Sequence, residues 1–246
     1  MLPQPRTTDY IKTKYHDFAD FLSDASSAER KKQSALQYLK IYEKTKEKNK
    51  PVVVELGTWK GFSTTAFLQA CHENGGHLYS VDIKDYSDVA AGNPQWTFIQ
   101  NDSTDVQGII GKAPKLKDGI DVLLIDSYHI RHHVEKEFYN WAPYLNKNAI
   151  IFFDDVDPFI YRAGERKDHR NNEFHWEDIQ DFVIELFRAN EDNMTLEMLF
   201  GSSGLAVLEK QSEKGAPLNK AVKAKYRTRS FWSQLKFRLS QIKNHD

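Results

Sequence analysis

The spacing of apolar residues changes near residue 50, and this change separates two kinds of expected structure. Between residues 11 and 22 large apolar side chains recur every three or four positions, which is typical of a helix. Residues 26–29 have the S-x-x-E form of a capping box, after which a second helix is expected to run toward Lys48. Residues 1–50 are therefore predicted to form an N-terminal helical segment.

After residue 50, short apolar runs alternate with stretches of helical spacing, which is typical of βαβ units and a parallel sheet. Strands are expected at 52–56, 77–82, 96–100, 121–126 and 149–153, and helices at 63–73 and 131–144. The run at 149–153 is apolar at every position, which predicts a strand in the middle of a sheet covered on both faces.

The C-terminal part of the expected domain begins with a polar, His-rich loop at 161–174, followed by a helix at 176–189. Strands at 195–200 and 205–209 are joined by Gly-Ser-Ser-Gly, which is short enough for a hairpin. The predicted class is α/β: a Rossmann-like, doubly wound, seven-stranded sheet, mostly parallel with a C-terminal antiparallel hairpin and helices on both faces. This domain is assigned residues 51–210, and residues 211–246 stand apart as a basic tail.

Composition excludes several classes of protein and of site. The net charge of −1 gives no global attraction to nucleic acid or to an anionic surface. The single cysteine, Cys71, excludes an intrachain disulfide and a cysteine-based zinc cluster. The first ten residues lack the apolar region of a secretory signal, and no apolar run approaches the ~20 residues of a membrane span. We expect a soluble, cytoplasmic protein.

The first predicted strand leads into a helix through the sequence E-L-G-T-W-K-G-F-S, residues 55–63. Glycines at such a turn allow the backbone to approach a ligand closely, below the free N–H groups of the next helix. The segment has neither G-x-G-x-x-G nor a Walker A pattern. It resembles motif I of class I S-adenosylmethionine-dependent methyltransferases, in a variant that lacks the middle glycine. The resemblance implies S-adenosylmethionine as cofactor, with contacts from five residues of this loop: Glu55, Gly57, Thr58, Gly61 and Ser63.

Acidic residues also follow the next two predicted strands. Asp82 ends the second strand, at about the ~20-residue offset at which an acid binds ribose hydroxyls in nucleotide-binding folds. Asp102 and Ser103 follow the third strand, where related enzymes place the group that contacts adenine. The other interpretation is that these acids are helix caps and turn formers. An acid at each successive strand end favours the cofactor site.

Three more carboxylates follow the fourth and fifth strands. Asp126 ends the fourth, and Asp154 and Asp155 end the fifth, so all three are expected at one edge of the sheet. Such carboxylates repel one another unless a cation neutralises them, and Mg²⁺ prefers oxygen ligands. We therefore expect Mg²⁺, or another hard divalent cation, at these three acids, with Asp126 also contacting the cofactor. The alternative is that the acids only cap the following turn.

The sequence I-D-S-Y-H at 125–129, together with the Asp-Asp pair before Pro158, resembles metal-dependent sugar O-methyltransferases and cephalosporin-hydroxylase-like proteins. The resemblance covers roughly residues 50–210. It implies that the three acids bind magnesium and that His129 is the general base; the alternative for His129 is a hydrogen-bonded loop histidine. Two departures stand out: Ser127 replaces a more usual glycine, and Lys147-Asn148 replaces a customary Gly-Gly.

The function expected from these features is Mg²⁺-dependent methylation of a hydroxyl on a sugar or glycoside. The alternatives are methylation of a catechol-like or other small-molecule hydroxyl, and a non-catalytic Rossmann-like binding module. The expected partner is a small-molecule or glycan acceptor, not nucleic acid, because the basic charge is confined to the tail. A homo-oligomer is compatible with the sequence, which carries no direct information on oligomeric state.

The tail contains a candidate basic amphipathic helix, in which Trp232, Leu235, Leu239 and Ile242 share one face. Three fates are open for this helix: weak contact with a membrane surface, binding to a partner, or docking on its own domain.

Overall fold

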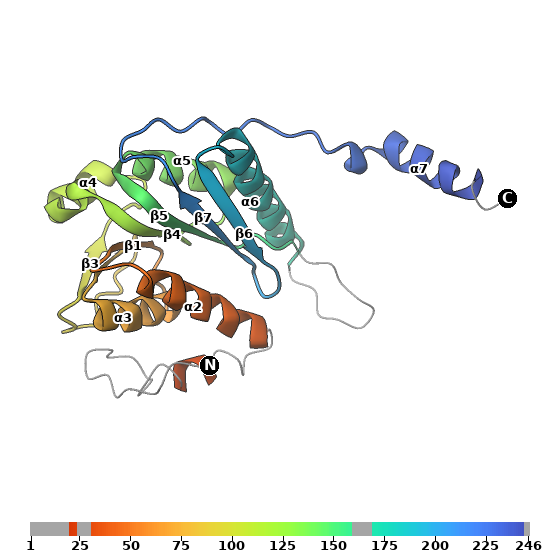
Figure 1. Ribbon diagram of the computed structural model, residues 1–246. Coiled ribbons are helices and arrows are strands. Elements are labelled where there is room, and N and C mark those ends of the chain that lie inside the picture. The colour runs from red at the N-terminus through yellow and green to blue at the C-terminus, as the bar shows by residue number, and fades with distance from the viewer. Residues whose placement is uncertain (1–19, 24–30, 159–168, 244–246) are drawn as a thin grey trace.

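The computed structural model describes residues 20–23, 31–158 and 169–243 (Figure 1). The capping box expected at 26–29, most of the helical pattern at 11–22 and much of the loop expected at 161–174 lie outside these residues. Among the described helices, none is long and apolar enough to cross a membrane.

A seven-stranded sheet forms the centre of the molecule, in the order β3-β2-β1-β4-β5-β7-β6. Its strands are β1 (Val52–Leu56), β2 (His77–Asp82), β3 (Trp96–Gln100), β4 (Ile120–Ile125), β5 (Leu145–Asp154), β6 (Met194–Leu199) and β7 (Leu205–Lys210). The first five strands are parallel, whereas β7 is antiparallel to both of its neighbours. The predicted fold class is confirmed.

The strand order reverses between β1 and β4, which pair side by side in the middle of the sheet. From β1 the chain continues outward through β2 to β3, and then crosses back to β4 on the other side of β1. Loops that leave neighbouring strands in opposite directions open a crevice at the carboxyl ends of those strands. The fold therefore places the ligand site above β1 and β4.

Helices cover both faces of the sheet (Figure 1). One face carries α2 (Lys31–Lys46) and α3 (Phe62–Asn74), and the other carries α4 (Val106–Lys112), α5 (Arg131–Trp141) and α6 (Arg170–Ala189). Side chains of β5 alternate between the two cores: Ile150 and Phe152 pack toward α3, whereas Ile151 and Phe153 pack toward α5 and α6. This alternation confirms that β5 is buried on both faces.

Several element boundaries differ from the sequence predictions. The strand β5 begins four residues early, at Leu145, because residues 145–148 extend the strand beyond its apolar run. The helix α4 was not predicted, since Gly108 and Gly111 interrupt a short apolar pattern. The helix α6 begins at Arg170 instead of residue 176, and His169, expected in a solvated loop, caps it by accepting the Asn171 N–H. The first turns of α6 are polar and exposed, so they carry no apolar signal.

The segment that follows β7 is bonded to the core up to Arg229. The backbone N–H of Ala221 donates to Tyr139 Oη at 2.7 Å, and that of Ala224 donates to Glu185. Arg229 then forms an ion pair of 2.7 Å with Asp181 on α6. Beyond this point α7 (Phe231–Lys243) extends away from the sheet and its helices (Figure 1).

Candidate active site

A cavity of about 570 Å³ lies at the carboxyl edge of the sheet. Residues of the predicted cofactor loop line one part of it, and the predicted acid cluster lines another. The residues concerned are Gly57, Thr58, Ser63 and Asp82 on the first side, and Asp126, His129, Asp154 and Asp155 on the second. A second cavity of about 280 Å³ shares Asp82 and Ser127 with the first, so the two adjoin.

The loop after β1 depends on glycine at two positions. Gly57 has a φ of +98°, and a Cβ atom there would lie 2.1 Å from the backbone oxygen of Asp126. Any side chain would therefore separate the loop from the end of β4. Gly61 has a φ of +75° and precedes the first turn of α3. Gly57 contributes to the cavity wall, whereas the contribution of Gly61 is to start the helix.

Glu55 is fully buried and lines neither cavity. Its carboxylate accepts hydrogen bonds from the hydroxyls of Ser63 (2.6 Å), Thr64 (2.8 Å) and Ser80 (2.5 Å). Burial raises the pKa of Glu55, the three hydroxyl donors oppose this, and the result is a pKa of about 7. The structure thus places this predicted cofactor ligand below the loop, where it joins β1, β2 and the start of α3.

Asp82 lies where the two cavities meet. Its Oδ2 accepts the backbone N–H of Thr58 at 2.9 Å, and its Oδ1 accepts that of Lys84 at 3.0 Å. The carboxylate therefore holds the cofactor loop against β2. Oδ2 also accepts the backbone N–H of Trp59 at 3.4 Å, so Oδ1 is the oxygen with remaining acceptor capacity. Thr58 Oγ1, on the same loop, is buried without a partner among the described residues.

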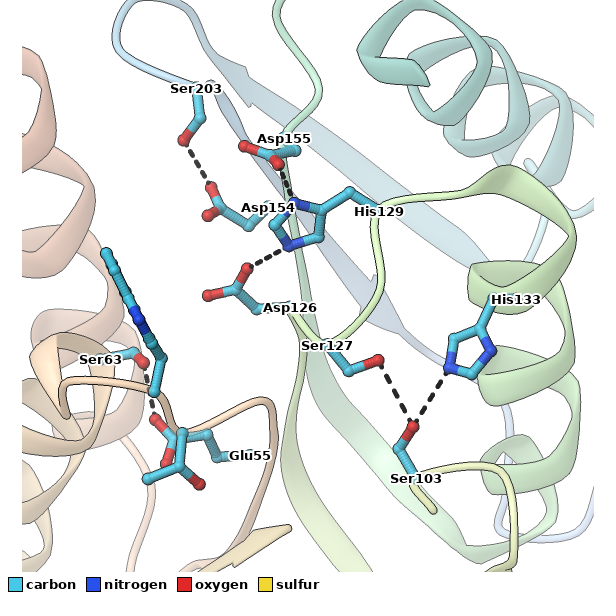
Figure 2. Close-up of polar contacts among 12 residues, drawn as sticks. Glu55, Ser63, Ser103, Asp126, Ser127, His129, His133, Asp154, Asp155 and Ser203 are labelled. Atoms are coloured by element: carbon cyan, nitrogen blue, oxygen red, sulfur yellow. Dashed lines mark hydrogen bonds and ion pairs between the residues drawn. The ribbon is translucent and has the colours of Figure 1, made fainter. Parts of the chain in front are cut away.

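Asp102 and Ser103 line the smaller cavity together with His133. Asp102 Oδ1 accepts both the backbone N–H and the hydroxyl of Thr104, each at 2.8 Å, and these bonds lower the pKa of Asp102. The hydroxyl of Ser103 lies 3.3 Å from His133 Nε2 and within hydrogen-bond distance of Ser127 (Figure 2). Asp102 is thus both a turn former, as the alternative interpretation held, and part of a cavity wall.

The acids after β4 and β5 lie together, as the sequence predicted. Figure 2 shows Asp126, Asp154 and Asp155 around His129. His129 Nε2 is 3.0 Å from Asp126, and His129 Nδ1 contacts Asp155. Burial raises the pKa of Asp126 and of Asp154, and the negative charges of the neighbouring acids raise both further. The cluster therefore contains three carboxyl groups and only one basic side chain, that of His129, to balance their negative charge.

His129 is the counter-charge of this cluster in the present arrangement. Burial alone would lower its pKa, but the hydrogen bonds and charges of Asp126 and Asp155 raise the pKa of His129 to about 12. Within the described ranges, no group of three or more acids, histidines or cysteines has a metal-binding geometry. The imidazole lies between the carboxylates that the sequence assigns to Mg²⁺.

Several residues at the edge were not found from the sequence. Ser203, in the β6–β7 turn, donates to Asp154 at 3.0 Å (Figure 2). Tyr38 of α2 lines the larger cavity and stacks on Phe62, with ring centroids 5.9 Å apart. Ser127, a departure from the expected motif, donates to the buried Glu137 at 2.5 Å. The sequence signals for this group were the Gly-Ser-Ser-Gly turn and the unusual serine at 127, but neither indicated these contacts, which join separate segments.

Comparison with known proteins agrees with this geometry. Residues 54–156 match the model of a family described as a methyltransferase domain. No curated protein matches the chain in sequence.

Solved structures share the fold. One is MycE methyltransferase from the mycinamycin biosynthetic pathway, in complex with Mg, SAH and mycinamycin VI: 19% identity, TM-score 0.54, 80% of this chain and 56% of that chain. Another is a putative caffeoyl-CoA O-methyltransferase from Staphylococcus aureus: 18% identity, TM-score 0.53, 71% of this chain and 83% of that chain. A third is CalS11, a TDP-rhamnose 3'-O-methyltransferase of calicheamicin biosynthesis. It has 15% identity and a TM-score of 0.50, and the alignment covers 71% of this chain and 77% of that chain.

At these identities the likeness concerns the fold, and this chain spans just over half the length of MycE. The family match begins within β1, covers β2, β3, β4 and β5, and includes the whole acid cluster, ending one residue after Asp155. The chain therefore has the class I S-adenosylmethionine-dependent methyltransferase fold that the sequence predicted, and residues 54–156 match a methyltransferase domain.

Proposed function

We propose that the protein transfers a methyl group from S-adenosylmethionine to a hydroxyl of a sugar or glycoside, in a reaction that needs a divalent cation. The observation that carries the proposal is the single cavity whose wall joins the cofactor loop to the acid cluster. A methyl donor held by one part and a hydroxyl held by the other would meet inside it. Such positioning accounts for much of the acceleration of a displacement reaction.

The cofactor half of the cavity fits S-adenosylmethionine in three respects. Oδ1 of Asp82 has remaining acceptor capacity for a ribose hydroxyl. Thr58 contributes a hydroxyl without a partner among the described residues. The adjoining cavity has apolar side chains in its wall, such as Val81 and Ile83, and a carboxylate at Asp102. This combination suits a purine ring. When bound, the cofactor supplies an electrophilic methyl group on a cationic sulfur.

The acid half is proposed to activate the nucleophile. An aliphatic hydroxyl is weakly acidic and must lose its proton to react. With His129 Nδ1 held by Asp155, Nε2 is the ring atom proposed to accept that proton. In the present arrangement His129 is protonated and Nε2 faces Asp126. This role therefore requires Asp126 to turn toward another positive partner and His129 to lose the proton on Nε2.

A divalent cation suits this cluster in charge and ligand type. Asp126, Asp154 and Asp155 offer oxygen ligands, and the repulsion that raises the pKa of Asp126 and of Asp154 would be relieved by a cation. When bound, such a cation lowers the pKa of a hydroxyl and orients it. Ser203 would keep Asp154 in position through its 3.0 Å hydrogen bond.

The choice of a sugar acceptor over a catechol rests on two structural relatives. CalS11 is a TDP-rhamnose 3'-O-methyltransferase, and the MycE structure contains Mg, SAH and mycinamycin VI. The relative from Staphylococcus aureus is a putative caffeoyl-CoA enzyme and represents the alternative acceptor class.

The test is methyl transfer from labelled S-adenosylmethionine to two acceptor panels, one of nucleotide sugars and glycosides and one of catechols, each with Mg²⁺ and with excess EDTA. We expect transfer to a member of the first panel that EDTA abolishes. Transfer to catechols alone would overturn the acceptor class, and full activity in EDTA would overturn the cation requirement. No transfer to either panel, combined with cofactor binding, would favour the non-catalytic binding module.

A further inference from the structure

One side of α7 is apolar and exposed. At the ~100° per residue of a helix, Phe231, Trp232, Leu235 and Leu239 fall within one arc of about 100°. Phe231 and Trp232 are 69% and 68% exposed, and Leu239 is 51% exposed. The phenyl and indole rings contact each other, with centroids 5.4 Å apart, and thus form a continuous apolar surface. Large exposed side chains gathered on one side of a helix mark an interaction surface.

Basic residues border this apolar side. By the same helical spacing, Lys236 lies next to one edge of the arc and Arg238 next to the other, and both are exposed. No acidic residue occurs between Glu213 and Asp246, whereas nine basic residues do. They are Lys214, Lys220, Lys223, Lys225, Arg227, Arg229, Lys236, Arg238 and Lys243. The whole segment is therefore positively charged although the protein as a whole is nearly neutral.

The base of α7 is fixed on the core. Arg229 forms ion pairs with Asp181 (2.7 Å) and Glu177 (3.5 Å) of α6, and its guanidinium lies 4.3 Å from the centre of the Tyr226 ring. Beyond this anchor, α7 points away from the sheet (Figure 1). The apolar side is thus presented outward from a defined point, and the core does not cover Phe231 or Trp232.

We propose that α7 lies in the surface of an anionic phospholipid bilayer and attaches the methyltransferase domain to it. The apolar side chains would enter the acyl boundary, while Lys236 and Arg238 extend to the headgroups. With 13 residues the helix is too short to span a bilayer, for which ~20 are needed.

Charge favours this occupant over the other candidates. If a second copy paired its α7 with this one, two basic helices would meet, and like charges across an interface oppose association. Nucleic acid would use the basic residues but would leave the apolar side uncovered. An anionic bilayer engages both features at once.

The experiment is flotation of the full-length protein with vesicles of phosphatidylcholine alone or of phosphatidylcholine with phosphatidylserine. We expect binding only to the anionic vesicles, and binding that weakens as salt rises. Trp232→Ser should lower the partition coefficient by about tenfold, since it removes a large apolar side chain from the lipid. Phe237→Ser is the matched control, because Phe237 is 65% exposed but lies on the opposite side of the helix; we expect a change of at most about twofold.

Charge variants complete the test. Lys236→Gln and Arg238→Gln should each weaken binding by about fivefold at low salt, which corresponds to about 1 kcal/mol per basic residue near the surface. Equal binding to neutral and anionic vesicles would overturn the proposal, as would equal effects of Trp232→Ser and Phe237→Ser. So would absence of vesicle binding together with a dimer that Trp232→Ser dissociates, because the surface would then join two copies of the chain. Binding of S-adenosylhomocysteine to each variant, measured alongside, reports that the core is intact.

Discussion

The two halves of the candidate active site hold their carboxylates in different ways. On the cofactor side, Glu55 and Asp82 accept hydrogen bonds from hydroxyls and backbone N–H groups, so their negative charge is distributed over fixed dipoles. On the acid side, Asp126 and Asp155 share His129 as the counter-charge, and burial and the neighbouring acids raise the pKa of Asp126 and of Asp154. The carboxyl groups of the first half have their hydrogen-bond donors before any ligand binds. The second depends on a positive charge, from a proton or from a cation.

This difference predicts that substitutions will separate binding from turnover. Changes on the cofactor side should alter cofactor affinity or stability, whereas changes on the acid side should alter turnover and cation dependence. Asp126 belongs to both halves, because it lines the shared cavity and its backbone contacts the cofactor loop at Gly57. It is therefore a poor residue for telling the halves apart, and the variants below avoid it.

The largest effect is expected for Asp155→Asn. Asp155 has a φ of +57°, which asparagine tolerates as well as aspartate, so the backbone should be retained. Because the variant loses a proposed cation ligand and the partner of His129, we expect activity to fall by more than about 10²-fold with unchanged affinity for S-adenosylhomocysteine. Asp118→Asn, on the exposed surface, is the control. Loss of cofactor affinity in Asp155→Asn would show that the two halves are not separable.

A comparable or smaller loss is expected for His129→Gln. If His129 Nε2 accepts the proton of the acceptor, kcat should fall by roughly 10²–10⁴-fold, the usual contribution of general base catalysis. The cation should still bind, which Mn²⁺ titration can measure. His132→Gln changes an exposed neighbouring histidine and should leave kcat unchanged. A normal kcat for His129→Gln would leave the base role to a carboxylate or to water.

On the cofactor side, Glu55 should make the free energy of unfolding depend on pH. The pKa of Glu55 is about 7 in the folded protein, against 4.5 for the free group. The folded state therefore binds more protons than the unfolded state between these values, and stability falls as pH rises through this window. The full contribution is about 3 kcal/mol, present below pH 4.5 and lost above pH 7.

Urea unfolding of the wild type and Glu55→Gln between pH 5 and 8 measures this effect. Glutamine cannot ionise, so its stability curve should be flatter than that of the wild type. Parallel curves would mean that Glu55 is not the titrating group. The control is Glu213→Gln, since Glu213 is an exposed acid outside the site whose pKa is lowered and not raised.

Removal of α7 should have the smallest effect on either half. A chain that ends at Ser230 retains the bonds from Ala221, Ala224 and Arg229 to the core. We expect its free energy of unfolding to change by no more than about 0.5 kcal/mol, with normal cofactor affinity. A chain that ends at Lys210 loses all these bonds, so thermal unfolding should show a clear destabilisation. Equal stability of the two truncated chains would contradict the packing of residues 211–229.

Much of the fold could be predicted from the sequence, because the first strands are short apolar runs with clear ends. The bounds of β1, β2 and β3 were predicted without error. Elements with weak apolar patterns were missed or shortened: α4 contains two glycines, and the first turns of α6 are polar. Local sequence does not report such elements, because tertiary contacts decide their extent.

Some features of the candidate site could likewise be predicted from the sequence, and others could not. The acids were predictable because the carboxyl ends of parallel strands meet at one edge of the sheet. The inward position of Glu55 and the placement of His129 between two acids depend on packing and side-chain orientation, which spacing does not determine. Ser203 and Tyr38 reach the site from the hairpin and from α2, so only the folded chain connects them to it.

Calorimetric titration with S-adenosylmethionine, in EDTA and then in Mg²⁺, tests the central claim most directly. We expect one binding site per chain under both conditions, because the cofactor half is complete without a cation. Asp82→Asn should weaken binding by about 10-fold or more, since a ribose acceptor is lost, whereas Asp85→Asn on the same loop should not. No binding in either buffer, or equal affinity of Asp82→Asn and the wild type, would contradict the assignment of the cofactor to this edge of the sheet.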